Sequence, residues 1–248
     1  MDRLLTGLIL ACFIFVSACN EVEPPPSGPL FRLVTYNELP TTGKSYGATW
    51  ADVDQNGRLD FLIGHHGNGV GLYFNGPGMH FVRQDSCAFL PCDNIDQHGT
   101  AACDFDGDGD WELYLTVGAE RVKGQGSNEM WTLYDDRTYR NALPADHFVA
   151  DEDGRGRGAV WVRLDADMYP ELLVLNYRSP ARLFRFDGGR WSDLSPFINA
   201  RADTAKTGKK SAKGTGRWLT VAAPADFDRD GYTDLFLAGD GYFLMHNL

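Results

Sequence analysis

The chain has 248 residues, of which 43% are hydrophobic and 23% charged, and this composition excludes both a disordered chain and a polytopic membrane protein. The formal net charge of -11 repels polyanions, which excludes nucleic-acid binding as the main function. The 28 glycines and 12 prolines indicate many tight turns, and no long segment has the 3.6-residue apolar period of a helix. These features predict an all-β chain.

The first residues have the features of an export signal. Arg3 supplies a positive charge, and residues 4–16 form an apolar stretch shorter than the roughly 20 residues of a membrane-spanning helix. Residues 16–19, Val-Ser-Ala-Cys, resemble the bacterial lipobox. The resemblance implies a signal peptide over 1–18 and a lipid on Cys19, and hence a protein anchored in the bacterial envelope, on the periplasmic side of the outer membrane or at the cell surface. Ordinary cleavage before an unmodified Cys19 is the alternative.

A tether and a single folded domain are expected after the signal. Residues 19–29 contain three consecutive prolines and predict a stiff, extended linker. The folded domain then covers residues 30–248, next to the membrane without entering it.

Two of the remaining cysteines are close in sequence. Cys87 and Cys92 bracket a four-residue loop, and an exported compartment permits a disulfide between them, with two free thiols as the alternative. Cys103 occupies a position filled by small or apolar residues in the repeats described next, so we expect it in the core.

Four segments of the chain align without gaps, and each reads as a strand, an acidic turn and a second strand. The segments are residues 50–61, 102–113, 161–172 and 224–235. A third apolar run follows every copy, and an outer strand follows the first three. The pattern predicts a β-propeller of four four-stranded blades, in which residues 30–35 supply the outer strand missing from the fourth copy and close the ring. An open row of hairpins, or part of a larger propeller, is the alternative.

The acidic turns predict calcium sites. Numbered from the first aspartate, three turns have carboxylate or amide side chains at positions 1, 3, 5 and 9 and glycine at position 6. Alternate side chains of an extended turn point toward one centre, the carbonyl of residue 7 can join them, and such an oxygen shell suits Ca²⁺ better than a transition metal. The expected ligands are Asp52, Asp54, Asn56, Arg58 (carbonyl) and Asp60; Asp104, Asp106, Asp108, Asp110 (carbonyl) and Glu112; and Asp226, Asp228, Asp230, Tyr232 (carbonyl) and Asp234. About three structural calcium ions are therefore expected, and the alternative is acidic turns that only shape the chain.

The same turn occurs in a known family of repeats. An EF-hand would need a bidentate acid at position 12, where Ile63, Leu115 and Leu237 stand. The motif instead resembles the FG-GAP/VCBS repeat, with its Asp-h-Asp-x-Asp-Gly-x-x-Asp turn, and the resemblance covers most of residues 46–248. It implies an integrin-like β-propeller with structural Ca²⁺ in its blades.

The third copy departs from this pattern. Arg163 replaces the first aspartate, Met168 replaces the glycine, and Pro170 enters the turn. We expect this turn to lack metal and to be held by Arg163 among the remaining acids. A decayed site with solvated acids is the alternative.

Signals for catalysis are poor. The sequence contains neither a G-x-S-x-G elbow nor a P-loop. His65 and His66 are adjacent and point different ways on a strand, so we expect a solvated loop rather than a metal pair. The basic stretch of residues 201–217 predicts a solvated loop between the third and fourth blades, with contact to an anionic surface as the alternative.

Two classes of function fit these observations. The first, which we favour, is a lipid-anchored, calcium-stabilised propeller that acts as a binding or adhesion module for a protein or glycan at the cell surface, without enzymatic activity. The second is an enzyme that acts on extracellular carbohydrate or another polymer in the central depression of the propeller.

Overall fold

The structure is a computed structural model that describes most of the chain from residue 44 onward. The described residues are 44–66, 69–78, 80–84, 96–118, 126–133, 139–143, 147–202 and 218–247. The chain divides into a unit of Met1–Thr35 and a unit of Tyr36–Leu248, and all described residues belong to the second unit.

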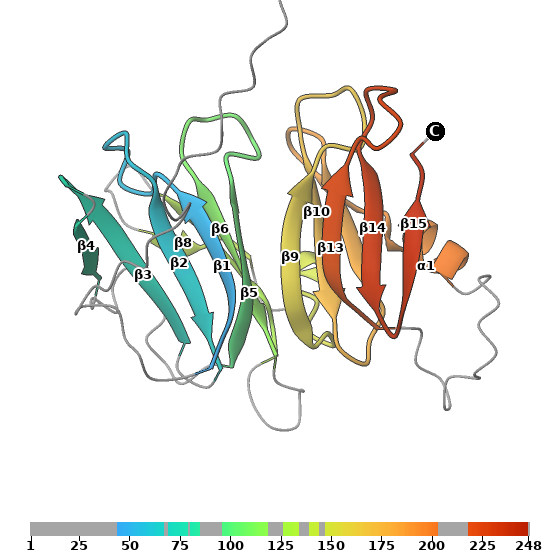
Figure 1. Cartoon of the computed structure of the whole chain (residues 1–248), viewed down its shortest axis with the longest axis horizontal. Helices are drawn as coiled ribbons and strands as arrows, with labels where there is room; N and C mark the ends of the chain where they lie inside the picture. The colour runs from blue at the N-terminus through green and yellow to red at the C-terminus, as the bar shows by residue number, and fades with distance from the viewer. Residues whose placement is uncertain are drawn as a thin grey trace, which may run out of the picture. The chain divides into compact units, whose positions relative to one another are not determined.

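The described strands form four antiparallel sheets, in each of which the strands lie side by side in chain order (Figure 1). Sheet 1 contains β1 (Ser45–Ala51), β2 (Asp60–His65), β3 (Gly69–Gly76) and β4 (His80–Arg83). Sheet 2 contains β5 (Gln97–Cys103), β6 (Glu112–Val117), β7 (Glu129–Leu133) and β8 (Tyr139–Asn141). Sheet 3 contains β9 (Gly156–Val162), β10 (Glu171–Asn176), β11 (Arg182–Phe186) and β12 (Trp191–Asp193). Sheet 4 contains β13 (Leu219–Ala225), β14 (Asp234–Gly239) and β15 (Gly241–Met245). The helices among the described residues are the short η1 (Phe148–Ala150) and α1 (Ser195–Ala202).

The first two strands of every sheet pair in the same register around the acidic turn. The acid at turn position 9 is the first residue of the second strand, and it pairs with the last residue of the first strand. The four pairs are Ala51 with Asp60, Cys103 with Glu112, Val162 with Glu171, and Ala225 with Asp234. All four acidic turns therefore lie at the same end of their sheets, at the top in Figure 1.

Hydrophobic cores lie between neighbouring sheets, because successive residues of each second strand face opposite sides. In β6, Leu113 and Leu115 pack against sheet 1, whereas Tyr114 packs against sheet 3. In β10, Leu172 packs against sheet 2 and Leu173 packs against sheet 4. This alternation explains why the second strands read as continuous apolar runs in the sequence.

The first strands of neighbouring sheets approach one another closely through glycine. A Cβ atom on Gly47 would lie 2.6 Å from the carbonyl oxygen of His98, and one on Gly99 would lie 2.5 Å from the Cα of Gly158. Larger residues at these positions would push the backbones apart. Residues from β1, β5, β9 and β13 together line a cavity of about 250 Å³.

The all-β class and the four repeated sheets predicted from the sequence are confirmed. The predicted ring is not: the described strands do not close into a propeller, and sheet 4 has three described strands. The segment of residues 30–35, expected to complete sheet 4, lies outside the described residues. Within the described ranges, no helix is long and apolar enough to cross a membrane.

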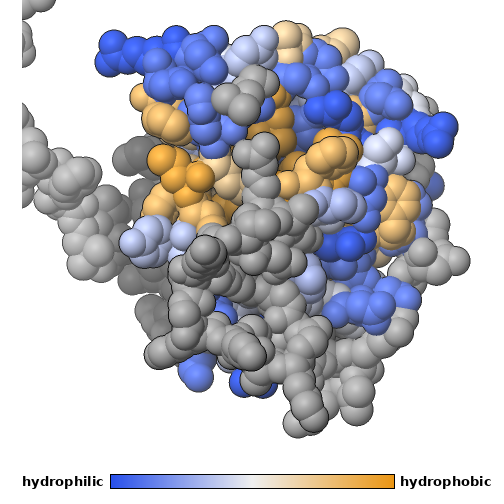
Figure 2. Space-filling view, turned by 90° about the vertical axis from the view of Figure 1, so that its right-hand side faces the viewer, coloured by the Kyte–Doolittle hydropathy of each residue, from blue (hydrophilic) through white to orange (hydrophobic). Residues whose placement is uncertain are grey.

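The outer face of sheet 4 is not covered by any other described sheet. Its large apolar residues are exposed because no further described sheet packs on them, and Figure 2 shows apolar surface on this side of the molecule. Tyr242 and Leu244 of β15 are 76% and 61% exposed, whereas Leu237, which faces sheet 3, is 1% exposed.

Candidate calcium-binding turns

The first acidic turn is folded around the side chains of its own aspartates. The Asp52 carboxylate accepts hydrogen bonds from the backbone N–H groups of Asn56 (2.9 Å) and Gly57 (2.8 Å). Asp60, at turn position 9, is fully buried, and its two oxygens accept from the N–H groups of Val53 (2.9 Å) and Asn75 (2.7 Å). The carboxylate at position 9 therefore ties the turn to the third strand of the sheet.

The second and fourth turns repeat this arrangement. Asp104 accepts from the N–H groups of Gly107 and Gly109, and Asp226 accepts from those of Asp230 and Gly231. The acids at position 9 again bind the amide of position 2: Glu112 accepts from Phe105 at 3.3 Å, and Asp234 accepts from Phe227 at 3.0 Å.

Each of these three turns gathers carboxylate oxygens at one point. One oxygen from each of three acids lies within 4.8 Å of the other two. The groups are Asp52, Asp54 and Asp60; Asp104, Asp106 and Asp108; and Asp226, Asp228 and Asp234. Such sets of oxygen donors fit Ca²⁺, which takes several carboxylate and carbonyl oxygens.

The remaining expected ligands have other contacts or lie outside these groups. The Asn56 amide donates to Asp54 at 2.7 Å, and its oxygen accepts from the Arg58 N–H at 3.0 Å. Asp110 accepts from the side chain of Gln55, which links the turns of sheets 1 and 2. Glu112 is not one of the three acids gathered in the second turn.

Burial and repulsion by neighbouring carboxylates raise the pKa of three acids in the first and second turns. Burial and the neighbouring Asp106 raise the pKa of Glu112 to about 8. Burial also raises the pKa of Asp60, with a contribution from Asp54, and that of Asp106, with a contribution from Asp108. A cation bound among the carboxylates would offset both effects.

The third turn contains a protein cation, but it is not the one expected from the sequence. The guanidinium of Arg185 on β11 contacts Asp165 at 2.5 Å and the fully buried Glu171 at 2.8 Å. Arg163 instead donates to the carbonyl oxygen of Asp167 at 3.3 Å. An arginine from the third strand thus contacts the acids of the turn that lacks the first aspartate.

A histidine occupies the equivalent position in sheet 4. Leu172 and Leu235 are the second residues of the second strands in sheets 3 and 4. The residues that pair with them, Phe184 and Met245, directly precede Arg185 and His246. His246 Nε2 lies 2.8 Å from Asp228 Oδ2. In the sequence, each of these residues is a basic side chain within or directly after the third apolar run. Our sequence analysis did not consider basic residues at this position.

The two adjacent histidines differ from the expected solvated loop. His65 is 6% exposed, and its Nδ1 is 3.0 Å from the hydroxyl of Ser45. His66 follows β2 and lies beside Asp96 and His98 of the neighbouring sheet. Packing of sheet 1 on sheet 2 therefore places His66 beside two polar side chains, whereas His65 is buried.

The other expected sites fall largely outside the described residues. Cys19, Cys87 and Cys92 are among the residues that the structure does not describe, as are residues 203–217 of the basic stretch. Cys103 is a free thiol, and burial raises its pKa to about 11. The thiol is therefore protonated at neutral pH, as expected of a core residue.

Comparison with protein families identifies the repeats. The FG-GAP-like repeat matches residues 52–115 and 163–237, which together make up more than half of the chain. The chain therefore belongs to the FG-GAP-like repeat family, and the resemblance inferred from the acidic turns is confirmed.

Two curated proteins are similar to the chain over most of its length. Cartilage acidic protein 1 of Homo sapiens is 23% identical over an alignment 304 positions long, which covers 95% of this chain and 45% of the human protein. Cartilage acidic protein 1 of Xenopus tropicalis is 24% identical over an alignment 278 positions long, which covers 84% of this chain and 43% of the frog protein. The chain thus spans less than half the length of these curated relatives.

Proposed function

We propose that the chain is an exported, calcium-stabilised binding module of the cell surface, in which the four sheets act as blades of a β-propeller. The observation that carries the proposal is the convergence of three carboxylates in the first, second and fourth turns. Membership of the FG-GAP-like repeat family and the similarity to cartilage acidic protein 1 support an extracellular repeat protein.

Calcium would act by stabilising the connection between the first two strands of a sheet. Asp52 and Asp54 come from the turn itself, whereas Asp60 begins β2 and also accepts a hydrogen bond from the backbone N–H of Asn75 in β3. An ion held by all three would fix the turn against the sheet and neutralise their repulsion. The ion thus has a structural role, and the loops and edges of the sheets remain free to contact a partner.

The proposal includes attachment to the membrane through a lipid on Cys19, in the bacterial envelope. Mass spectrometry of the purified protein tests this directly. We expect an acylated N-terminal peptide that begins at Cys19, and its loss in a Cys19→Ser variant.

The end of the sheets opposite the acidic turns offers a surface for a partner. Tyr177 follows β10 at this end, and its ring stacks on Trp218 with ring centroids 4.5 Å apart. Three guanidinium groups lie 5.2 to 5.4 Å from the centre of the Tyr177 ring, those of Arg155, Arg157 and Arg178. Aromatic rings and guanidinium groups together favour an acidic ligand, and we expect an acidic glycan, with an acidic protein segment as the alternative.

Binding to polysaccharides and to cell-surface proteins tests the proposed function. The calcium-loaded chain is applied to acidic and neutral polysaccharides, and both retention and release of soluble products are measured. We expect retention on the acidic polymers without turnover, and about tenfold weaker retention of Arg178→Gln, because a charge-assisted contact is lost. Arg190→Gln, at an exposed turn of sheet 3, is the matched control and should bind normally.

One result would contradict the binding module, and another would contradict the surface proposed for it. Turnover that is lost on replacement of Arg157, which lines the cavity between the first strands, would favour the enzyme. Equal retention of Arg178→Gln and Arg190→Gln would exclude the Tyr177 surface.

A further inference from the structure

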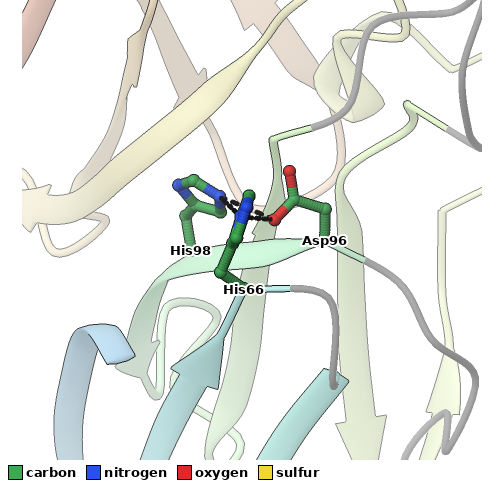
Figure 3. A group of neighbouring side chains, drawn as sticks. All are labelled: His66, Asp96 and His98. Carbon is green, nitrogen blue, oxygen red and sulfur yellow. Dashed lines mark hydrogen bonds and ion pairs between the residues drawn. The ribbon is translucent and has the colours of Figure 1, made fainter. Parts of the chain in front are cut away.

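We propose that His66, Asp96 and His98 form a binding site for one divalent transition-metal ion, with Zn²⁺ as the expected ion. The three side chains come from two sheets and point toward one another (Figure 3). His66 directly follows β2, and Asp96 and His98 lie at the start of β5. The site lies at the end of the sheets opposite the acidic turns, because β2 ends there and β5 begins there.

The backbone around the site is held in place by hydrogen bonds. The N–H of His66 donates to the carbonyl oxygen of Lys44 at 2.9 Å, which continues the pairing of the first two strands. The N–H of Gly118, after β6, donates to the carbonyl oxygen of Asp96 at 2.6 Å. Both sheets therefore present their ligands from fixed backbone positions, as a metal site requires.

The distances between the three polar atoms are those of ligands that share an ion. His66 Nδ1 and His98 Nε2 are 3.1 Å apart, and His98 Nε2 is 2.8 Å from Asp96 Oδ1. His66 Nδ1 contacts the same carboxylate oxygen. Ligand atoms on a tetrahedral zinc ion, with bonds of about 2.0 to 2.1 Å, are about 3.3 Å apart, so small outward movements would admit the ion.

With Asp96 ionised, protons alone do not make all three contacts favourable. If both facing nitrogens carry a proton, each can donate to Asp96, but the two N–H groups then repel each other. If either nitrogen lacks its proton, its lone pair faces the carboxylate oxygen. A cation between the three atoms makes every contact attractive, which is why the arrangement points to a metal rather than to a hydrogen-bonded cluster.

The donor set and its exposure indicate the class of ion and an open position. Two imidazole nitrogens and one carboxylate oxygen suit Zn²⁺ and similar transition metals, whereas Ca²⁺ prefers oxygen alone. The side chain of His98 is 2% exposed and that of His66 is 45% exposed. Tyr46 stacks on the buried ring of His98 with centroids 4.5 Å apart, so among the described residues the more open side of the site is that of His66.

Two neighbours limit the affinity and the space of the site. A Cβ atom on Gly118 would lie 2.7 Å from His98 Nε2 and 2.5 Å from a guanidinium nitrogen of Arg157. The positive charge of Arg157 should make binding weaker than at a closed site with four protein ligands. Gly118 leaves room that any side chain would reduce, so Gly118→Ala should weaken metal binding although it removes no ligand.

Zinc titration of the full chain tests the proposal, with calcium in excess so that the acidic turns do not compete. Calorimetry should give one Zn²⁺ per wild-type chain. Affinity should fall at least tenfold in His66→Ala and remain unchanged in His80→Ala, a matched exposed histidine on β4. Co²⁺ should give the visible absorption of a four-coordinate ion in the wild type and lose it in His66→Ala.

Folding of each variant is checked by thermal unfolding in metal-free buffer, where His66→Ala should match the wild type. If it does not, Gly118→Ala replaces it in the same titration. The proposal is overturned if the wild type binds no Zn²⁺ under these conditions, or if zinc binds equally to the wild type, His66→Ala and Gly118→Ala.

Discussion

Replacement of Arg185 by methionine is expected to destabilise the third sheet, because it removes the cation that neutralises the third turn. Methionine keeps much of the length and the apolar stem of the side chain. The change leaves Glu171, which is fully buried, and Asp165 without their guanidinium partner. The uncompensated charge on Glu171 is the main source of the predicted loss.

The size of the effect follows from the burial of the three groups. Breaking one partner of a buried ion pair costs about 3–5 kcal/mol. The side chains of Arg185 and Asp165 are 34% and 36% exposed, so solvent screens part of the interaction. We therefore expect a loss of about 2–3 kcal/mol in the free energy of unfolding, which corresponds to a fall of about 4–12 °C in Tm.

Urea unfolding in saturating calcium measures this loss, with Arg190→Met as the exposed control on the same sheet. The double variant Arg185→Met/Glu171→Gln should recover part of the stability, because it removes the buried charge as well as its partner. A loss below about 0.5 kcal/mol, or one equal to that of the control, would refute the assignment of Arg185 as the cation of this turn.

Two further predictions concern the buried acid of the second turn and the cores between sheets. Burial raises the pKa of Glu112 to about 8 from an ordinary value of 4.5, so its contribution to stability is fully present below pH 4.5 and is lost as the pH rises through 8. In calcium-free buffer the Tm of the wild type should therefore fall over this range more steeply than that of Glu112→Gln, and parallel curves would contradict the account. Leu237→Ala, at a core position that is 1% exposed, should cost about 2–5 kcal/mol, whereas Leu244→Ala, at a position that is 61% exposed, should cost less than about 0.5 kcal/mol. Equal losses in urea unfolding would mean that both faces of sheet 4 are packed and would contradict this assignment.

The repeated turns could be predicted from the sequence because their ligands lie within a few residues of one another. The motif consists of local features: acids at alternate positions such as Asp52 and Asp54, the glycine of the turn, and the acid that begins the second strand. The register that places Asp60 opposite Ala51 follows from the length of the turn. The number of sheets followed in the same way from the number of turns.

The basic side chains beside the third and fourth turns could not be predicted by the same reasoning. Arg185 and His246 reach the turns from third strands whose distance in sequence varies with the intervening loop. Their positions depend on strand register, which a single sequence leaves open. Our sequence reasoning therefore favoured Arg163, which stands inside the turn and donates only to a backbone carbonyl.

The cluster of His66 and His98 depends on packing rather than on any local pattern. The two residues are 32 positions apart and meet because β1 and β2 lie against β5. Close approach of these strands needs Gly47 and Gly64, whose role is visible only in three dimensions. The pattern of the sequence predicted the sheets correctly but not the contacts at their edges.

The binding of calcium tests the central claim most directly, by titration of metal-free protein combined with thermal unfolding. With dissociation constants of about 10⁻⁴ to 10⁻³ M, calcium at about 10 mM should add about 1.4–2.7 kcal/mol per site. The account predicts three Ca²⁺ per chain and a rise in Tm of at least about 8 °C. The rise should be lost in the triple variant Asp52→Asn/Asp104→Asn/Asp226→Asn and kept in the exposed control Asp240→Asn. A chain that binds no calcium and unfolds at the same temperature with and without the ion would contradict the account.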